Sequence, residues 1–249
     1  LMAMMVMMTA CQQSKEDYIK EFEAFVEELS EECADYTEEQ WEAKVDEIAA
    51  LGMEYIVLME SSLVFDKCAE SYFETDIYPP APMKTKNPIA ALMRAAERNG
   101  LKVFMSCGFY GIWYHTKENI TSEAVKERAF KAMKQLYEAY GNNKAFYGWY
   151  LPDETEIAPY FDEDFIKYVN EYAAYGRSFN KDLKILIAPF GTRLAAADDK
   201  YVEQLKRLDC DIIAYQDEVG VEKSTTEETR VYFERLNKAH KIAGKSAIW

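Results

Sequence analysis

Short apolar runs alternate with longer amphipathic segments along the chain from residue 55 onward. The runs are rich in β-branched and aromatic residues and are continuously apolar, which is typical of strands buried on both faces of a parallel sheet. The six predicted strands are Tyr55–Met59, Lys102–Cys107, Ala145–Tyr150, Lys184–Pro189, Asp211–Tyr215 and Ser246–Trp249. The helices predicted between them cover residues 87–99, 121–140, 161–177, 197–208 and 225–243. Successive strands start about 27 to 48 residues apart, the size of a βαβ unit, so the pattern predicts an α/β fold.

Two further amphipathic helices are predicted before the first strand. Apolar residues recur at helical spacing over residues 15–33, with acidic residues between them. A second helix begins after Thr37, where Thr37 and Gln40 have the spacing of a capping box. It is expected to end at Leu51-Gly52, because glycine tolerates the left-handed conformation that closes many helices.

Polar and aromatic residues follow the predicted strands directly, which favours a barrel over a doubly wound sheet. A doubly wound sheet usually binds its ligand through a glycine-rich first loop, and the sequence contains neither GxGxxG nor GxxxxGK[ST]. A barrel instead places its chemistry at the C-terminal ends of several strands. We therefore expect a TIM-like (βα) barrel over residues 37–249, preceded by a helical segment over residues 12–36. Since six strands are clear, the barrel is expected to be incomplete and truncated at its C-terminus.

The first eleven residues resemble the end of a bacterial export signal. Residues 1–10 are nearly all apolar but too few to span a bilayer as a helix. Met8-Thr9-Ala10-Cys11 resembles a lipobox, in which the cysteine receives a lipid. We expect a signal remnant over residues 1–11, truncated at its start, in an exported protein anchored to the bacterial envelope through Cys11, in the periplasm or at the cell surface. The alternative is an ordinary buried apolar N-terminus.

The net charge argues against some binding partners, and the cysteine content argues against metal and disulfide sites. A net charge of −15 repels phosphate backbones, so neither nucleic acid nor a basic contact with an anionic membrane is expected. Neutral sugars are not disfavoured. The chain has five cysteines and two histidines without a CxxC pair, so we expect no zinc site, no disulfide framework and no cofactor. Cys107 and Cys210 are expected to act as small buried hydrophobes.

The strongest candidate for chemistry is Glu154, at the end of the run Phe146–Glu154. A carboxyl group at a barrel mouth, shielded by Trp149 and Tyr150, would have a raised pKa, which suits a general acid. Aromatic rings nearby suit the apolar face of a sugar, and Asp153 is a candidate substrate contact. The alternative is that both acids are solvated loop residues.

A second cluster follows the predicted strand at 211–215. Gln216 could donate hydrogen bonds to sugar hydroxyls, and Asp217 could pair with Glu154 or bind a sugar. An acidic turn closed by Gly220 is the alternative. Glycoside hydrolysis needs two carboxyl groups, about 5–5.5 Å apart for retention and about 6.5–9.5 Å apart for inversion. Glu60 is a third candidate, because it too follows a predicted strand.

Two aromatic segments are expected to border a binding cleft. The loop at 63–86 is long and contains several tyrosines and prolines, which is typical of a cleft wall. Tyr110 and Trp113 belong to the next loop, where His115 is expected to be a surface residue. The predicted stacking platform comprises Tyr110, Trp113, Trp149 and Tyr150.

The chain resembles the DUF4434 family, a set of bacterial, often Bacteroidetes, proteins placed with TIM-barrel glycoside hydrolases. The resemblance covers roughly residues 37–249 and rests on these motifs: TEEQWEAKVDEIAALGMEYIVL, AAERNGLKVFMSCGFYGIW, GWYLPDE, KILIAPF and DIIAYQDEVG. It implies that Glu154 follows the fourth barrel strand as a catalytic acid/base. It also implies that Gln216 and Asp217 end the sixth strand and that Ser246–Trp249 begins the seventh.

Three functions remain open from the sequence. The first is a glycoside hydrolase that acts on a neutral glycan, with Glu154 and Asp217 as catalytic residues and Glu60 as a sugar ligand or second acid. The second is a non-catalytic carbohydrate-binding surface lipoprotein that uses the stacking platform. The third is a structural or assembly protein built on a barrel remnant.

Overall fold

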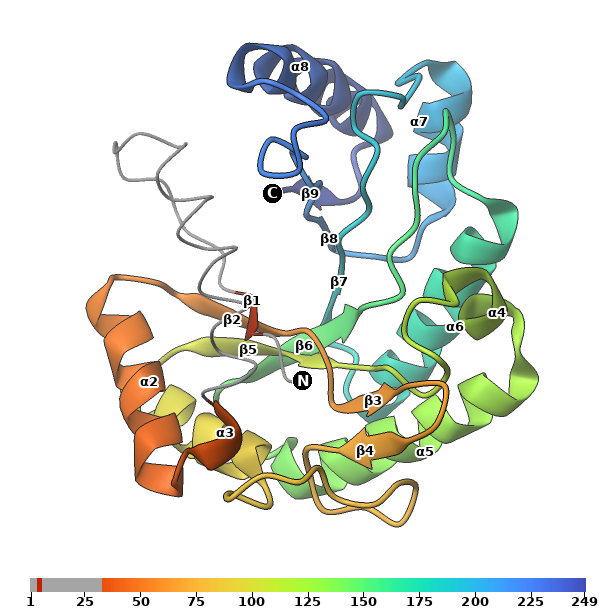
Figure 1. The fold of residues 1–249 in the computed structure, drawn as a ribbon. Helices are drawn as coiled ribbons and strands as arrows, with labels where there is room; N and C mark the ends of the chain where they lie inside the picture. Colours follow the sequence, from red (N-terminus) through yellow and green to blue (C-terminus); the bar gives the residue numbers. More distant parts are fainter. Residues whose placement is uncertain (1–3, 6–32) are drawn as a thin grey trace.

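Six parallel strands form a curled half-barrel in the computed structural model, which describes residues 4–5 and 33–249 (Figure 1). The strands adjoin one another in chain order: β2 (Tyr55–Leu58), β5 (Lys102–Ser106), β6 (Phe146–Leu151), β7 (Lys184–Ile187), β8 (Ile212–Ile213) and β9 (Ala247–Ile248). The short β1 (Met4–Met5) pairs antiparallel with the outer edge of β2. The predicted TIM-like α/β architecture is confirmed, and each predicted strand is present, although all but β6 are shorter than predicted.

The helices surround the outside of the curled sheet (Figure 1). They are η1 (Cys33–Asp35), α2 (Glu38–Ala50), α3 (Pro88–Asn99), α4 (Thr116–Thr121), α5 (Glu123–Tyr140), α6 (Glu163–Phe179), α7 (Asp199–Arg207) and α8 (Thr226–Ala243). The predicted capping box is confirmed, because Thr37 and Gln40 exchange backbone-to-side-chain hydrogen bonds at the start of α2. The sequence did not predict β1, η1, α4 or the hairpin of β3 (Ser62–Val64) and β4 (Ala69–Ser71).

The sheet separates two apolar layers. The inner layer fills the curl of the half-barrel and consists of Val57, Phe104, Tyr150, Leu186, Ala188, Ile212 and Ala214. The outer, larger layer packs between the sheet and the helices and includes Trp149. Because side chains alternate along a strand, Trp149 and Tyr150 belong to opposite layers. At the inner face, the Trp249 ring lies 4.9 Å from the Tyr55 ring, so the two ends of the parallel sheet curl towards each other.

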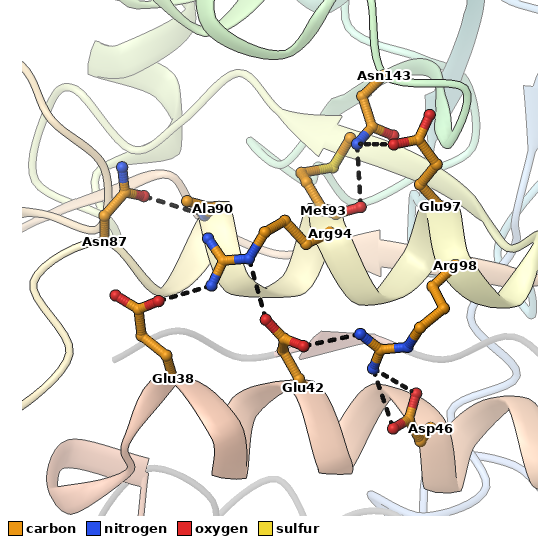
Figure 2. A network of polar contacts seen from close by, with 10 residues as sticks. All are labelled: Glu38, Glu42, Asp46, Asn87, Ala90, Met93, Arg94, Glu97, Arg98 and Asn143. Carbon is orange, nitrogen blue, oxygen red and sulfur yellow. Dashed lines mark hydrogen bonds and ion pairs between the residues drawn. The ribbon is translucent and has the colours of Figure 1, made fainter.

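An ion-pair network joins the first two long helices. Figure 2 shows Arg94 and Arg98 on α3 reaching the acids of α2. Arg94 contacts Glu38 and Glu42, and Arg98 contacts Glu42 and Asp46. Both arginine side chains are 49% exposed. The network therefore aligns α2 with α3 at the surface, while the apolar layer beneath supplies most of the packing.

The N-terminal predictions and those for two cysteines have different outcomes. Cys11 and most of the predicted helix at 15–33 lie outside the described residues. Within the part of the chain that is described, no helix has both the length and the apolar character needed to cross a bilayer. Cys107 and Cys210 are buried among apolar residues, as predicted.

Candidate functional site

A cavity of about 490 Å³ lies at the carboxyl ends of β2, β5, β6 and β7. In a parallel barrel this end of the sheet is where ligands usually bind. The cavity is lined by Met59, Glu60, Leu63, Phe65, Phe109, Trp113, Tyr114, Thr116, Pro152, Glu154 and Phe190. Two carboxyl groups thus face a surface that is otherwise mostly apolar and aromatic. Such a combination is typical of a binding site for a small organic ligand.

Glu154 follows the end of β6 and lies half-buried in this cavity. The Tyr150 hydroxyl donates a hydrogen bond to Glu154 Oε1 at 2.7 Å, and Gln216 Nε2 donates to Oε2 at 2.5 Å. Burial raises the pKa of Glu154, and these two hydrogen bonds partly oppose that shift because they favour the carboxylate. Glu154 is therefore a fixed carboxyl group that retains its proton to a higher pH than an exposed glutamate.

Gln216 follows β8 and reaches the site across the intervening strand β7. Its Nε2 also donates to the Ala188 carbonyl oxygen at 2.9 Å, which fixes the amide above the end of β7. Gln216 and Glu154 therefore lie in contact, although the strands they follow are not neighbours in the sheet.

Glu60 is the second carboxyl group of the cavity and is 3% exposed. It follows β2, and its charge acts on Tyr150. Burial, and then the charge of Glu154, raise the pKa of Tyr150 well above its usual range, and Glu60 adds to this shift. Glu60 and Glu154 therefore both line the cavity close enough to Tyr150 for their charges to act on its hydroxyl.

Asp217 does not pair with Glu154, contrary to the sequence expectation. Its Oδ1 accepts a hydrogen bond from the Val219 backbone N–H at 3.1 Å, and its carbonyl oxygen accepts from the hydroxyls of Ser224 and Thr229. Asp217 is not among the residues that line the cavity. Because successive residues of an extended segment point to opposite sides, Gln216 faces the site and Asp217 stabilises the turn before α8.

Asp153 is neither a solvated loop acid nor a cavity residue. It is 6% exposed, and its Oδ1 accepts a hydrogen bond from Asn119 Nδ2 at 2.9 Å. The Tyr168 hydroxyl lies 3.4 Å from Oδ2. Burial raises the pKa of Asp153 to about 7, against the opposing hydrogen bond from Asn119. Asp153 therefore points towards the helices α4 and α6 and is not among the residues that line the cavity.

The predicted stacking platform is only partly present. Trp113 lines the cavity and is 46% exposed, and its ring lies edge-on to that of Tyr114 at 5.5 Å. Trp149 has no exposed surface, since it packs between Phe146 and Gly176 in the helix-facing layer. The remaining two platform residues are also buried: the Tyr110 hydroxyl bonds to Ser61 and the Tyr150 hydroxyl to Glu154. The available stacking surface is therefore Trp113 with Tyr114.

The loop at 63–86 contributes to the cavity wall, as predicted, through Leu63 and Phe65. Sequence reasoning did not single out Phe65, Tyr114 or Phe190 as site residues. Phe190 could have been found, because it follows a predicted strand as directly as Glu154 does. His115 is a surface residue whose Nδ1 lies 3.0 Å from Glu118 Oε2, in line with the expectation.

Among residues 33–249 and Met4–Met5, no group of three or more histidine, cysteine, aspartate or glutamate side chains is arranged to bind a metal ion. At the cavity the structure brings together the carboxyl groups of Glu60 and Glu154, with the Tyr150 hydroxyl and the Gln216 amide hydrogen-bonded to Glu154. This set can donate a proton, accept a proton and stabilise a developing positive charge.

The fold is similar to those of solved glycoside hydrolases. A candidate α-L-fucosidase from Bacteroides thetaiotaomicron superimposes with a TM-score of 0.66 at 15% identity, over 86% of this chain and 67% of that one. An endo-1,4-β-mannanase from Rhizomucor miehei gives a TM-score of 0.55 at 10% identity, over 86% and 72%. A glycosyl hydrolase family 2 member from Bacteroides cellulosilyticus gives 0.50 at 11% identity, over 85% and 22%.

No curated protein sequence matches the chain. The family model described as a domain of unknown function, DUF4434, matches residues 23–249. The cavity, the strand-end acids and the barrel topology therefore occur within the matched region, and the chain belongs to the DUF4434 family.

Proposed function

We propose that this protein is a glycoside hydrolase that acts on a neutral glycan, with Glu154 as the general acid/base. The observation that supports this most directly is the environment of Glu154, which lines the cavity, receives two fixed hydrogen bonds and has a raised pKa. A carboxyl group with a raised pKa keeps its proton to a higher pH and can give that proton to a glycosidic oxygen.

Glu60 is the second carboxyl group in this proposal, in preference to Asp217. Both Glu60 and Glu154 line the cavity, whereas the Asp217 side chain contacts its own turn. In the reaction, Glu154 donates its proton to the glycosidic oxygen as the bond to the anomeric carbon breaks. Glu60 either removes a proton from the water that attacks that carbon, or attacks the carbon itself. In the second case water then breaks the resulting glycosyl ester, and Glu154 takes the proton of that water.

The substrate proposed is a neutral glycan, because the protein is strongly acidic and the cavity wall is apolar. A net charge of −15 repels anionic polymers. The exposed face of Trp113 suits the apolar face of a pyranose, and Phe109 and Phe190 extend that surface. The similarity of the fold to glycoside hydrolases of several substrate classes agrees with this reaction type but does not select one sugar.

The test is Glu154→Gln, assayed with chromogenic aryl glycosides and soluble neutral polysaccharides. The substitution keeps the size of the side chain and removes the proton, so kcat should fall by about 10²–10⁴-fold. Glu156→Gln is the matched control, because Glu156 is an exposed acid two residues away that pairs with Arg193. An unchanged rate in Glu154→Gln would refute the proposed role.

A second candidate function is glycan binding without turnover. Exposure of Trp113 and Tyr114 side by side at the cavity favours it. Calorimetric titration with neutral oligosaccharides, together with product analysis, distinguishes the two functions. Binding with no product, lost in Trp113→Ala, would support the binding protein and exclude the hydrolase for those glycans.

We further propose that the protein is exported and anchored to the bacterial envelope by a lipid on Cys11. The support is the lipobox-like run Met8–Cys11. Metabolic labelling with an alkyne fatty acid in a bacterial host tests it, with Cys11→Ser as the variant and Cys68→Ser, at an exposed cysteine, as the control. Label that persists in Cys11→Ser would contradict the anchor.

A further inference from the structure

We propose that Asp153 is a positioning residue: through Asn119 it fixes residues 109–115, the aromatic loop, against the cavity. The aromatic loop contributes Phe109, Trp113 and Tyr114 to the cavity wall. This inference deepens the proposed function and rests on it in one respect, since it assumes that the aromatic loop forms the wall that contacts the glycan.

One buried amide group links Asp153 to the aromatic loop. Asn119 lies on α4 and is 3% exposed. Its Nδ2 donates to Asp153 Oδ1 at 2.9 Å and to the Ile112 carbonyl oxygen at 3.0 Å. Both protons of the amide are therefore used, one towards the end of β6 and the other towards the backbone just before Trp113.

The amide of Asn119 is also confined by the backbone of the aromatic loop. A Cβ atom at Gly111 would lie 2.1 Å from Asn119 Oδ1 and 2.9 Å from Val125 Cγ2, so only glycine fits there. At the other end, the Asn119 backbone N–H donates to the His115 carbonyl oxygen at 2.9 Å. The side chain of Asn119 thus fills the inside of the turn that the aromatic loop makes.

The opposite side of the aromatic loop is attached to the β3–β4 hairpin. Ile112 forms a bridge with Val64, and the Trp113 backbone N–H donates to the Val64 carbonyl oxygen at 3.1 Å. The Tyr114 hydroxyl donates to Asp66 Oδ1 at 2.5 Å. The hairpin and Asn119 therefore support the segment Ile112–Tyr114 from two sides, while Arg128 and Tyr78 hold the Tyr110 carbonyl oxygen at the start of the loop. Loss of Asn119 leaves the segment Ile112–Tyr114 attached through the hairpin.

Burial of the Asp153 carboxyl group costs free energy of folding. Among the described residues, no lysine or arginine forms an ion pair with Asp153, although the side chain is almost fully buried. A buried carboxyl group without a cation costs free energy that an apolar residue would not. Because Glu154 is the next residue, Asp153 connects the proposed acid and the aromatic wall through one short segment.

The experiment measures amide hydrogen exchange over residues 109–121 in Asn119→Leu, which removes both donors at similar volume. We expect exchange at residues 111–115 to rise about tenfold, since a lost buried hydrogen bond changes an equilibrium by roughly that factor. Asn170→Leu is the matched control, because Asn170 also donates to a backbone carbonyl, that of Arg207, away from the cavity. Equal exchange over 111–115 in Asn119→Leu and Asn170→Leu would overturn the inference.

Two further variants test Asp153 itself and allow for a failure of Asn119→Leu to fold. Asp153→Asn keeps an oxygen that can accept from Asn119, so protection of the aromatic loop should remain, whereas Asp153→Leu should lose it. Gly111→Ala displaces Asn119 from the loop side and should raise exchange as Asn119→Leu does. Protection lost in Asp153→Asn, or retained in both Asp153→Leu and Gly111→Ala, would overturn the inference.

Ligand assays separate this inference from the proposed function. For any neutral glycan that the wild type hydrolyses, Asn119→Leu should raise KM by about tenfold while kcat changes less, because the wall contacts the sugar and not the reacting bond. A fall in kcat with KM unchanged would contradict the positioning role. If the wild type neither binds nor hydrolyses any glycan, the proposed function fails, and the exchange data still decide whether Asp153 positions the loop.

Discussion

Glu154 and Gln216 are 62 positions apart in the chain, and Gln216 Nε2 donates to Glu154 Oε2 at 2.5 Å. The strands that precede them, β6 and β8, are not neighbours, because β7 lies between them. The contact therefore forms above the end of β7, where the Ala188 carbonyl oxygen accepts the second bond from the same amide. Curvature of the sheet brings the two side chains together, so the site depends on the barrel-like curl.

The first prediction concerns the pKa of Glu154. Removing either donor, in Gln216→Ala or Tyr150→Phe, should raise this pKa further, because both hydrogen bonds favour the carboxylate. A general acid is active when protonated, so the alkaline limb of the kcat/KM profile should move to higher pH while the maximal rate falls.

Rates measured from pH 5 to 9 check this prediction. Gln135→Ala is the control, since Gln135 donates to Asp76 at the surface. An alkaline limb that stays in place, or moves to lower pH, would show that Glu154 is not the group that sets it.

Fold class followed from the sequence because its signals are local and repeated. The helix predicted at 87–99 is observed at Pro88–Asn99, and the capping box at Thr37 is present. The hairpin β3–β4 was missed because its strands have three residues each, too few for any periodicity. The predicted helix at 121–140 begins only at Glu123, since the Ser122 side chain caps it and separates it from α4.

The sequence predicted which strand ends form the site but not which side chains face the cavity, as Trp149 and Tyr150 illustrate. Adjacent strand residues must point to opposite faces, so the two rings cannot line the same cavity. Both faces of this sheet are apolar, however, and the sequence alone does not tell which ring faces inward. For the same reason, the sequence alone does not tell that Glu60 lines the cavity and Asp217 does not.

The second prediction concerns Asp153 and stability. The pKa of Asp153 is about 7 in the folded protein, above its usual value of 3.8, so the folded state binds the proton more tightly than the unfolded state. This contribution to stability is present at low pH and is lost as pH rises from about 4 to about 7. Asp153→Asn removes it, and between pH 5 and 8 the variant should gain about 2–3 kcal/mol relative to the wild type.

Urea unfolding at pH 5, 6, 7 and 8 measures that difference, with Asp182→Asn as an exposed control. A difference between Asp153→Asn and the wild type that is independent of pH would mean that Asp153 does not titrate in this range.

The third prediction concerns Gly148 in the middle of β6. A Cβ atom there would lie 2.1 Å from the carbonyl oxygen of Lys184 on β7. Because that oxygen belongs to the backbone of a central strand, it cannot move away without breaking the sheet. Gly148→Ala should therefore cost about 3 kcal/mol or more. Gly244→Ala, where φ is +64° and no atom lies within 4 Å, should cost only about 1 kcal/mol. Equal losses in denaturant unfolding would contradict the steric argument.

The fourth prediction concerns the network between α2 and α3 (Figure 2). Arg98→Ala removes contacts with Glu42 and Asp46, but the arginine is 49% exposed and solvent screens both pairs. The loss should be below about 1 kcal/mol and should shrink as salt is raised to 1 M. Lys134→Ala, which removes an isolated pair within α5, should cost less than Arg98→Ala. A loss in Arg98→Ala that does not depend on salt would indicate packing rather than charge.

The last prediction concerns His240, which lies on the buried face of α8 and connects this helix to residues next to β8 and β9. Its Nδ1 lies 3.0 Å from the Ser246 carbonyl oxygen, which can only accept, so Nδ1 bears the proton. Nε2 then accepts from the Tyr215 hydroxyl at 2.8 Å, and the Tyr201 hydroxyl lies 2.8 Å from that of Tyr215. Burial lowers the pKa of His240, so the folded state favours the neutral ring and the unfolded state binds the proton more tightly.

The stability that neutral His240 contributes is therefore complete above about pH 6.5 and is lost as pH falls below that value. His240→Gln removes the titrating group, so its stability relative to the wild type should rise as pH is lowered from 7.5 to 5. The other histidine, His115, is at the surface, and His115→Gln is the matched control for urea unfolding at pH 7.5, 6.5, 5.5 and 5. Parallel curves for wild type and His240→Gln would mean that His240 titrates alike in both states. The hydrogen-bonded chain from Tyr201 to Ser246 would then tolerate a charged ring.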